Sequence, residues 1–257
     1  MKVDVIIPTN RPAAGLISVL ESFKKQSYQD FTILLITEGE QQALQEICNQ
    51  IRIPKVAIFS IPSGTSNAAF ARNTGLRHAT GEIIVFSDDD MVVSADFIMA
   101  HVNSHKIHNN AIVRGLRYQK RADGSFYLPR WEQNAIKHWK MMSQESSWAY
   151  FVTSNASVSM SMLKQIDGFD MNFTWSGCED TDLAYRLLQE GAQPVTNENA
   201  VNYHLGIDDM QIKFEKRIGN FKYLREKYPH DSMIQWFVRL TLRTIQEGQV
   251  EQLFLGE

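Results

Sequence analysis

The sequence predicts an α/β protein built on a doubly wound, mostly parallel (mixed) β-sheet flanked by helices, with further helices at its C-terminal end. Short apolar runs alternate with segments of helical spacing from residue 3 to residue 87, and this alternation is typical of successive βαβ units. The run at 82–87 is continuous rather than alternating, which indicates a strand buried on both faces. We therefore expect parallel strands in the middle of the molecule.

The N-terminal half is expected to contain four strands and three helices. The strands are predicted at 3–7, 31–36, 56–61 and 82–87, and the helices at 13–26, 41–49 and 67–79. Gly81 is expected to terminate the third helix, because glycine is common just after a helix. Since the carboxyl ends of parallel strands meet at one edge, the polar exits of these strands should converge on one site.

The C-terminal half is expected to mix shorter elements. The sequence predicts a helix at 95–109, a strand at 112–118, a small hairpin or loop at 120–127 and a less regular stretch at 129–147. A strand at 153–160, a short helix at 161–166, strand-like pieces at 194–196 and 200–203, and helices at 212–228 and 232–247 follow. No linker is visible, so we expect one domain over 1–257, made of the parts 1–119, 120–210 and 211–257.

The composition argues against several classes of protein. The net charge of −3 provides no basic excess for the phosphates of nucleic acids. Two cysteines, Cys48 and Cys178, are too few for a disulfide framework. No stretch has the length of a membrane-spanning helix or a signal peptide. We expect a cytoplasmic protein, whose basic segment 212–228 and apolar tail 250–255 offer peripheral contact with the inner membrane face.

Three consecutive aspartates, Asp88, Asp89 and Asp90, follow the expected central strand. Like charges this close repel each other, so a positive partner must offset them, and a divalent cation is the simplest one. A solvated acidic turn is the alternative. Ligands of open α/β sheets bind outside the carboxyl ends of the strands, which favours the cation.

A second acidic cluster opens the helix that follows Cys178. Glu179, Asp180 and Asp182 fall in its first turn, where the helix dipole favours acidic residues, so capping alone could explain them. Capping suits Asp182 better than the other two. Trp175 and Gly177 precede the pair in a glycine-containing loop that can approach a ligand closely.

Two further patterns have both a structural and a functional interpretation. His101, His105 and His108 share one face of the predicted helix, and we expect three exposed side chains rather than a metal site. The three tryptophans of the central region are expected to pack in the core rather than to form an aromatic platform for a sugar ring: Trp131, Trp139 and Trp148.

Taken together, these segments resemble family 2 glycosyltransferases with the GT-A fold. The matching segments are VDVIIPTNR, FARNTGLRHATGEIIVFSDDDM and GFDMNFTWSGCEDTDLAYRLLQEG, which lie within residues 3–205 in an order that is specific to the family. The block from Trp175 to His204 also resembles the carboxyl half of galactosyltransferase- and chondroitin-polymerase-type enzymes.

The resemblance implies a site for a nucleotide-sugar donor, preferably a UDP-sugar. Asp88 and Asp90 match the outer residues of the DXD motif, which contacts the ribose and holds Mn²⁺ or Mg²⁺ on the diphosphate. Asp90 would be the direct metal ligand, Asp89 is the substitute that some relatives use, and His204 would complete the metal shell. The other implied donor contacts are Pro8, Thr9, Arg11, Arg72 and Asn73, together with Glu38, which stands in place of an aspartate that binds uracil.

The resemblance also implies roles on the acceptor side. Asp180 matches the catalytic base, with Glu179 and Trp175 as acceptor contacts. The acceptor would carry its hydroxyl on a saccharide, a lipid-linked molecule or a peptide, and would be held by loops at 120–150 and 170–178. The sequence does not indicate an oligomeric state.

The chemistry of sugar transfer supports this interpretation independently. A leaving diphosphate gains negative charge that a divalent cation stabilises, and an acceptor hydroxyl needs a carboxylate to take its proton. We therefore expect an inverting, metal-dependent transferase. Two alternatives stay open: a sugar nucleotidyltransferase, which the single Arg and single Gly at 9–15 disfavour, and a nucleotide-sugar-binding module without catalysis.

Overall fold

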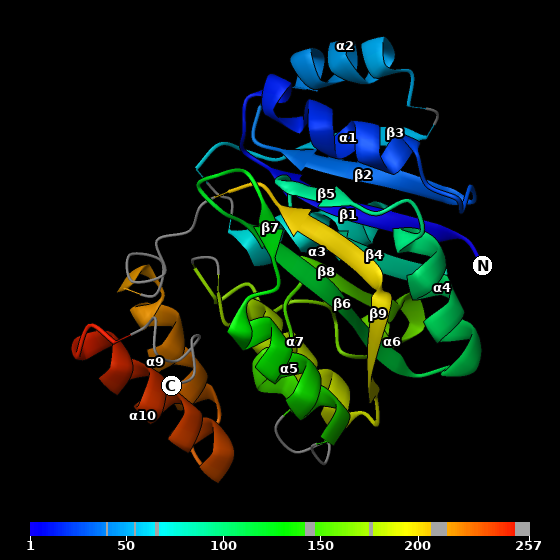
Figure 1. Cartoon of the computed structure of the whole chain (residues 1–257). Helices are drawn as coiled ribbons and strands as arrows, with labels where there is room; N and C mark the ends of the chain where they lie inside the picture. The colour runs from blue at the N-terminus through cyan, green and yellow to red at the C-terminus, as the bar shows by residue number, and fades with distance from the viewer. Residues whose placement is uncertain are drawn as a thin grey trace.

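The computed structural model of the protein describes residues 1–39, 41–53, 55–64, 67–141, 147–174, 177–206 and 215–249. It shows one curled β-sheet with helices packed on both faces (Figure 1). The predicted apolar tail 250–255 and the side chain of Trp175 lie outside these residues.

The N-terminal elements follow the predicted order, with bounds that differ by a few residues, and include one strand, β5 (Met91–Val93), that was not predicted. They are β1 (Val3–Thr9), η1 (Ala13–Leu16), α1 (Ile17–Lys24), β2 (Phe31–Thr37), α2 (Gln41–Ile51), β3 (Val56–Ser60), α3 (Ala68–His78), β4 (Ile83–Ser87), β5 (Met91–Val93) and α4 (Phe97–Ile107). The strand β1 extends two residues beyond the predicted 3–7, so that Pro8 lies inside it.

The remaining elements are more numerous than the sequence pattern suggested. They are β6 (Ala111–Lys120), β7 (Phe126–Tyr127), α5 (Arg130–Met141), η2 (Ser147–Tyr150), β8 (Asn155–Ser159), α6 (Met160–Gln165), α7 (Glu179–Gln189), β9 (Gln193–His204), α9 (Ile218–Lys227) and α10 (Ser232–Gln246). The predicted hairpin is confirmed, since β7 pairs with the end of β6. The two predicted pieces 194–196 and 200–203 are one long strand, β9, whose pairing with β6 is interrupted by an irregularity next to Gly115.

The sheet is mixed, as predicted. Its described strands run in the order β3-β2-β1-β4-β8-β6-β9-β5, with β7 added to β6. The first four strands of that order are parallel to each other, and β8 is antiparallel to both of its neighbours. The last strand, β5, pairs antiparallel with β9, so the chain just after β4 returns to the far edge of the sheet.

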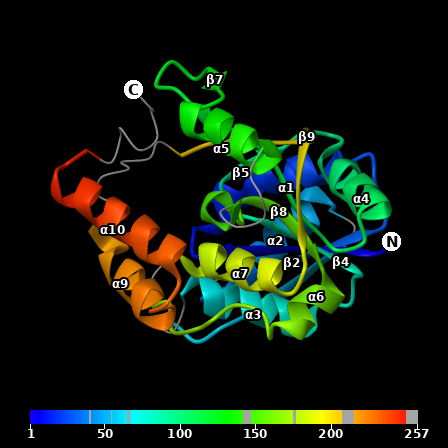
Figure 2. The same ribbon diagram turned by 90° about the horizontal axis from the view of Figure 1, so that it is seen from below.

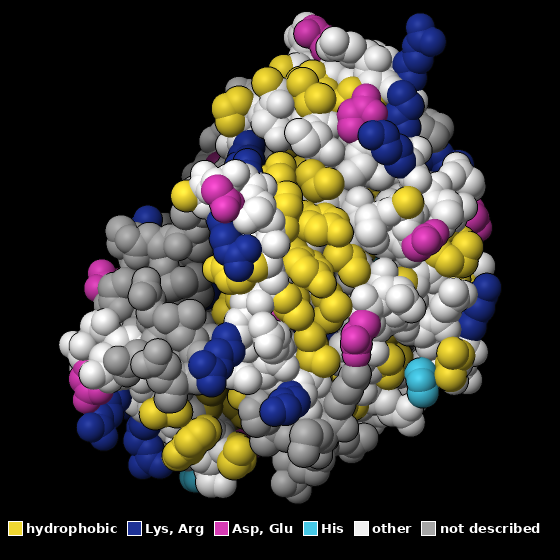
Figure 3. Space-filling view, viewed as in Figure 1, with side chains coloured by type: hydrophobic (Ala, Val, Ile, Leu, Met, Phe, Trp, Pro, Cys, Tyr) yellow, Lys and Arg dark blue, Asp and Glu magenta, His cyan; other side chains and the backbone are white. Residues whose placement is uncertain are grey.

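Both faces of the sheet carry an apolar layer, which explains the continuous apolar runs of the N-terminal strands. Along β1, Ile6 packs with the layer under α3, α7 and α10, whereas Val5 and Ile7 pack with the layer under α1, α2 and α4. Figures 1 and 2 show these two sets of helices on opposite sides of the strands. Hydrophobic side chains also gather over the middle of the molecule, where β5, β6 and β9 lie (Figure 3).

The histidines of α4 correct one prediction. His101 and His105 are buried rather than exposed, and both hydrogen-bond to the Ser157 hydroxyl at 2.9 Å. Burial lowers the pKa of His101 to about 3 and that of His105 to about 4, so both rings are neutral at pH 7. His101 and His105 therefore form a core-facing polar network between α4 and β8, whereas His108 is half-buried just after the end of α4.

Two local predictions were wrong for reasons of packing. The stretch 129–147 was expected to be irregular, but α5 is a regular helix whose buried Glu132 forms an ion pair with the equally buried Arg114. Gly81 does not end α3, which stops at Ala79 with an extended backbone. A glycine is needed at position 81 because a Cβ there would lie 2.7 Å from the backbone nitrogen of Asp4. Trp139 and Trp148 are buried in the core, as predicted.

Candidate active site

The exits of β1 and β4 meet, as the parallel arrangement predicts. The Thr9 hydroxyl donates a hydrogen bond of 2.8 Å to Asp89 Oδ2. Arg11 reaches both carboxylates, with Nε 3.0 Å from Asp89 Oδ1 and Nη2 2.7 Å from Asp90 Oδ2. Burial and the neighbouring aspartates raise the pKa of Asp89, against the hydrogen bond from Thr9 and the charge of Arg11. The guanidinium thus supplies the positive charge that the triplet requires.

His204 joins this cluster through the pairing of β9 with β5. Its register partner is Met91, so its ring lies next to Asp90, with Nε2 3.1 Å from Asp90 Oδ2. On the other side of the ring, Nδ1 lies 2.9 Å from Gln119 Oε1 and 3.0 Å from Arg117 Nη2. Burial raises the pKa of Asp90, but the hydrogen bond and charge of His204, with the charges of two arginines, lower it below its ordinary value.

The second acidic cluster stands at the N-terminus of α7. Cys178 precedes the helix in a left-handed conformation (φ 71°), which turns the chain so that Glu179 is buried and Asp180 is partly exposed. Glu179 Oε2 accepts a hydrogen bond from the Gly177 N–H, and Asp180 Oδ1 accepts one of 2.9 Å from the Thr181 N–H. Burial and the adjacent Glu179 raise the pKa of Asp180 to about 7.

Arg72 links the two clusters. Its side chain, 6% exposed, donates from Nη1 to Glu179 Oε1 at 2.9 Å and from Nη2 to Asp88 Oδ1 at 3.1 Å. The aspartate triplet and Asp180 therefore face one space, a cavity of about 940 Å³. A cavity of this size lies at the upper end of those that hold drug-sized ligands, where acidic, basic and apolar side chains can all contact one molecule.

The structure brings most of the predicted site residues to this cavity. Its lining includes Pro8, Thr9, Glu38, Arg72, Asp88, Asp89, Asp90, Glu179, Asp180 and His204. Glu38 accepts a hydrogen bond of 3.2 Å from the Gly64 N–H, which holds its carboxylate against the loop after β3. Arg11 reaches the same group through its ion pairs.

Asn73 is placed differently. Its side-chain amide donates to the Phe169 carbonyl at 2.8 Å and accepts from the Phe169 N–H at 2.9 Å. Both polar atoms are therefore used to fasten α3 to the loop that precedes α7. Asp182 likewise binds neighbours rather than facing the cavity, since it accepts hydrogen bonds from Arg186, Lys227 and Tyr228.

Three cavity residues were missed by the sequence reasoning. Arg117 and Gln119 alternate along β6 and contact His204, a relation that only the β6–β9 register reveals. Arg217 precedes α9 and packs on Gly177, where a Cβ would lie 2.5 Å from its Cδ. It lies within the basic segment 212–228 that was predicted as a helix, and its charge acts to lower the pKa of Asp180.

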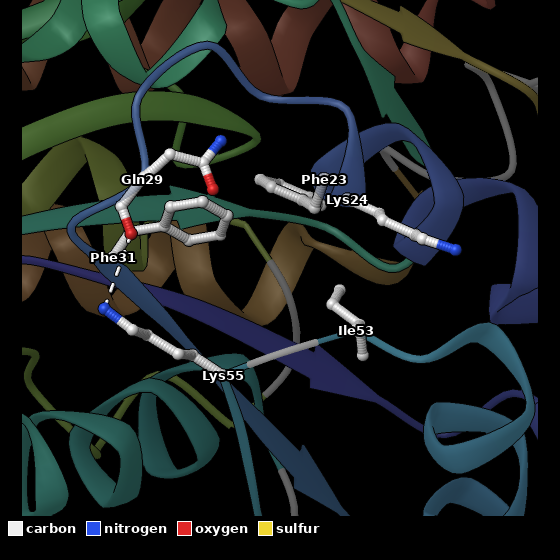
Figure 4. Close-up of a pocket in the computed structure, with 6 residues that line it drawn as sticks. All are labelled: Phe23, Lys24, Gln29, Phe31, Ile53 and Lys55. Atoms are coloured by element: carbon white, nitrogen blue, oxygen red, sulfur yellow. Dashed lines mark hydrogen bonds between the residues drawn. The ribbon is translucent and has the colours of Figure 1, made fainter.

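A second, much smaller cavity lies at the opposite edge of the sheet, where β2 and β3 begin (Figure 4). Its volume of about 10 Å³ is no larger than one water molecule needs. Phe23 and Phe31 line it, and Lys55 donates to the Gln29 carbonyl beside it. None of the predicted site residues that the structure describes lines it.

The carboxylates of Asp88 and Asp90 and the imidazole of His204 form a donor set that suits Mn²⁺ or Mg²⁺, with the nitrogen favouring Mn²⁺. Within the described ranges, no group of three or more histidine, cysteine, aspartate or glutamate side chains already stands in a metal-binding arrangement. Arg11, 44% exposed in its side chain, forms ion pairs with both Asp89 and Asp90.

The family model described as Glycosyl transferase family 2 matches residues 4–167. The chain belongs to this family, as the resemblance of its motifs implied. It is therefore a glycosyltransferase.

Among curated relatives, the uncharacterized glycosyltransferase YfnE of Bacillus subtilis (strain 168) is 23% identical over 286 residues, covering 89% of this chain and 71% of the relative. The chondroitin synthase of Escherichia coli is 20% identical over 262 residues, covering 88% of this chain and 38% of the synthase. The latter match agrees with the resemblance noted for the block from Trp175 to His204.

Two solved structures are similar in fold. S. aureus TarS 1-349 in complex with UDP has a TM-score of 0.65 at 16% identity, covering 88% of this chain and 66% of that one. Mannosyltransferase PcManGT from Pyrobaculum calidifontis in complex with GDP-Man and Mn²⁺ has a TM-score of 0.66 at 15% identity, covering 95% and 69%. The fold is the GT-A fold. Among the described residues, no helix combines the length and apolar character needed to cross a membrane.

Proposed function

We propose that the protein transfers a sugar from a nucleotide-diphosphate sugar, preferably a UDP-sugar, to an acceptor hydroxyl in one inverting displacement. The observation that carries this proposal is the double contact of Arg72, which holds Asp88 of the first acidic cluster and Glu179 of the second around one cavity. Single displacement needs a leaving-group site and a base on opposite sides of the sugar, and two linked acidic clusters can supply both.

The donor side comprises Pro8, Thr9, Arg11, Glu38 and the aspartate triplet. Asp90 and His204, with Asp88, would hold a divalent cation, which when bound stabilises the negative charge of the departing diphosphate. The neighbour PcManGT was solved with Mn²⁺ and GDP-Man, and TarS with UDP, which supports a metal and a nucleotide here. Arg11 would leave the carboxylates and neutralise phosphate oxygens instead.

The preference for uracil as the nucleobase of the donor follows from Glu38. Its carboxylate lines the cavity beside the loop after β3, at the place where the family resemblance puts the uracil contact. A carboxylate can accept the N–H of uracil, and the added methylene of glutamate relative to aspartate moves that acceptor outward. UDP-sugars are therefore the first donors to test.

The acceptor side is built around Asp180. Its carboxylate is partly exposed to the cavity, and its raised pKa places it near neutrality, where a general base transfers protons most efficiently. Asp180 would take the hydroxyl proton of the acceptor as the oxygen attacks the anomeric carbon. Glu179 is held by Arg72 and Gly177, so it would position the helix start and keep the pKa of Asp180 high.

A thermal-shift panel tests the proposal directly. UDP-, GDP- and dTDP-sugars are added with and without Mn²⁺, because a ligand of the folded state raises its melting temperature. We expect a UDP-sugar to stabilise the wild type only with Mn²⁺, and Asp90→Ala to lose that effect while Asp30→Ala, an exposed carboxylate at the other edge, keeps it. No response to any nucleotide sugar would contradict the proposal, and pyrophosphate release from a nucleoside triphosphate and a sugar phosphate would identify a nucleotidyltransferase instead.

A further inference from the structure

The acceptor side of the cavity continues as an apolar groove beside α10. Met233, Trp236 and Leu240 line it from that helix, and Trp148 and Phe151 line it from the segment before β8. The α10 residues are large and well exposed, at 39%, 54% and 38% of their surfaces. An exposed apolar stripe that opens into a catalytic cavity is a feature of ligand contact rather than of packing.

The exposed stripe is distinct from the face of α10 that packs on the protein. Ile234 and Val238, which follow Met233 and Phe237 directly in the sequence, are buried in the core, and so is Ile245 further along the helix. The groove residues follow a helical spacing at 233, 236, 237 and 240, so they share one side of the helix. Figures 1 and 2 both place α9 and α10 together as an outer pair of helices beside α7.

The chemistry of this wall favours an apolar chain over the hydroxyl groups of a sugar. Of the five α10 residues that line the groove, Met233, Trp236, Phe237 and Leu240 offer no carboxylate, amide or guanidinium. The fifth, Thr241, already donates its hydroxyl to the Phe237 carbonyl at 2.9 Å. Sugars are recognised by several polar groups at once, whereas an apolar chain needs only area removed from water.

Positive charge stands between the base and the groove. Arg217 packs on Gly177, two residues before Glu179, and its charge acts on Asp180. One helical turn later Phe221 meets Phe237 of α10, with ring centroids 6.2 Å apart. Lys216, which is exposed, also lines the cavity. From Arg217, whose charge acts on Asp180, one turn of α9 therefore leads to the apolar wall of α10.

We propose, on the basis of the transferase function above, that the acceptor is an amphiphile whose parts match this order. Its hydroxyl-bearing head lies at Asp180, an anionic phosphate lies at Lys216 and Arg217, and an apolar chain lies along Met233, Trp236 and Leu240. Charge complementarity fixes the phosphate, and continuity with the catalytic cavity fixes the direction of the chain.

Isothermal titration of the full chain, with UDP and Mn²⁺ present, tests this assignment with octyl phosphate, inorganic phosphate, octanol and maltotriose as probes. Octyl phosphate is expected to bind at least about tenfold more tightly than the other three, because only it engages both the cations and the apolar wall. Leu240→Asn is expected to weaken the binding of octyl phosphate about tenfold. The matched control Ile107→Asn, at a 75% exposed position on α4, is expected to leave its binding unchanged.

Several results would overturn the assignment. Maltotriose binding that Leu240→Asn abolishes would make the groove a sugar platform. If octyl phosphate binds only after residues 250–257 are removed, the groove is a binding site for that segment of the same chain. If the protein is a dimer that Leu240→Asn converts to monomers, the groove is a binding site for a second copy of the chain. If the wild type binds UDP in Mn²⁺ but does not bind octyl phosphate, only the proposed class of acceptor is overturned. If the wild type does not bind UDP in Mn²⁺, the transferase proposal itself is contradicted.

Discussion

Arg72 and Glu179 form a buried ion pair, with Nη1 2.9 Å from Oε1 and side chains that are 6% and 2% exposed. They are 107 residues apart in the chain. Arg72 lies on α3 beneath the exit of β4, and Glu179 is the first residue of α7. Because the same guanidinium also binds Asp88, the distance between the two acidic clusters is set by one side chain.

Replacing Arg72 tests this linkage. Arg72→Met leaves the Glu179 carboxylate buried without its cation, so we expect the free energy of unfolding to fall by about 3–5 kcal/mol. Urea denaturation measures the change. Arg77→Met, an exposed arginine on the same helix, is the control and should lie within about 0.5 kcal/mol of wild type. Adding Glu179→Gln to Arg72→Met should restore part of the loss, and a double variant less stable than Arg72→Met would contradict the pairing.

Arg11 should compete with the metal. In the structure its guanidinium lies on Asp89 and Asp90, where a cation would otherwise neutralise the charge. Arg11→Gln is therefore expected to raise the affinity for Mn²⁺ alone by about threefold. The same variant is expected to bind UDP more weakly in saturating Mn²⁺, because a partner of the phosphate oxygens is lost. The free Mn²⁺ signal in electron paramagnetic resonance reports the first effect, and calorimetry the second. Weaker Mn²⁺ binding by Arg11→Gln would contradict the competition.

The pH dependence of transfer should report Asp180. Burial and Glu179 raise its pKa to about 7, and a general base acts only when it is deprotonated, so kcat/KM should rise with pH and level off above about 7. Glu179→Gln removes a negative charge beside Asp180 and should move the midpoint of this rise to lower pH. A rate profile whose midpoint stays in place in Glu179→Gln would show that another group sets it.

Lys227 should fasten α9 to α7. Its ammonium lies 2.7 Å from Asp182 and 2.6 Å from Asp170, and Asp182 is fully buried. Lys227→Met removes one of the two cations paired with that carboxylate, the other being Arg186, so we expect a loss of about 1.5–3 kcal/mol in urea denaturation. Lys222→Met on the exposed side of the same helix should be nearly neutral. Equal stability of the two variants would mean that Tyr228 and Arg186 suffice for Asp182.

Much of the fold could be predicted because the buried strands of the N-terminal half are short and mostly apolar, interrupted only by single polar residues such as Asp4 and Thr32. The exits of β1 and β4 followed from that prediction, and Thr9, Arg11 and the aspartates meet there. Burial on both faces leaves this mark in the sequence whatever the loops do. The acidic start of α7 was visible for a similar reason, since a helix N-terminus has its own local pattern.

The features that could not be predicted depend on contacts between distant segments. Arg117 and Gln119 look like ordinary strand residues until the register of β6 and β9 places them on His204. The helix α5 carries the buried charge of Glu132, which no local pattern explains without Arg114 on β6. The α4 histidines resembled a surface stripe, because the sequence does not reveal that Ser157 lies against them.

The central claim is that Asp180 takes the proton of the acceptor hydroxyl while the donor site works independently of it. The most direct measurement is the single-turnover rate of sugar transfer by Asp180→Asn, taken together with its affinity for UDP in Mn²⁺. We predict a loss of about 10²–10⁴-fold in rate with donor affinity within a factor of about two of wild type. Transfer by Asp180→Asn at the wild-type rate would contradict the account.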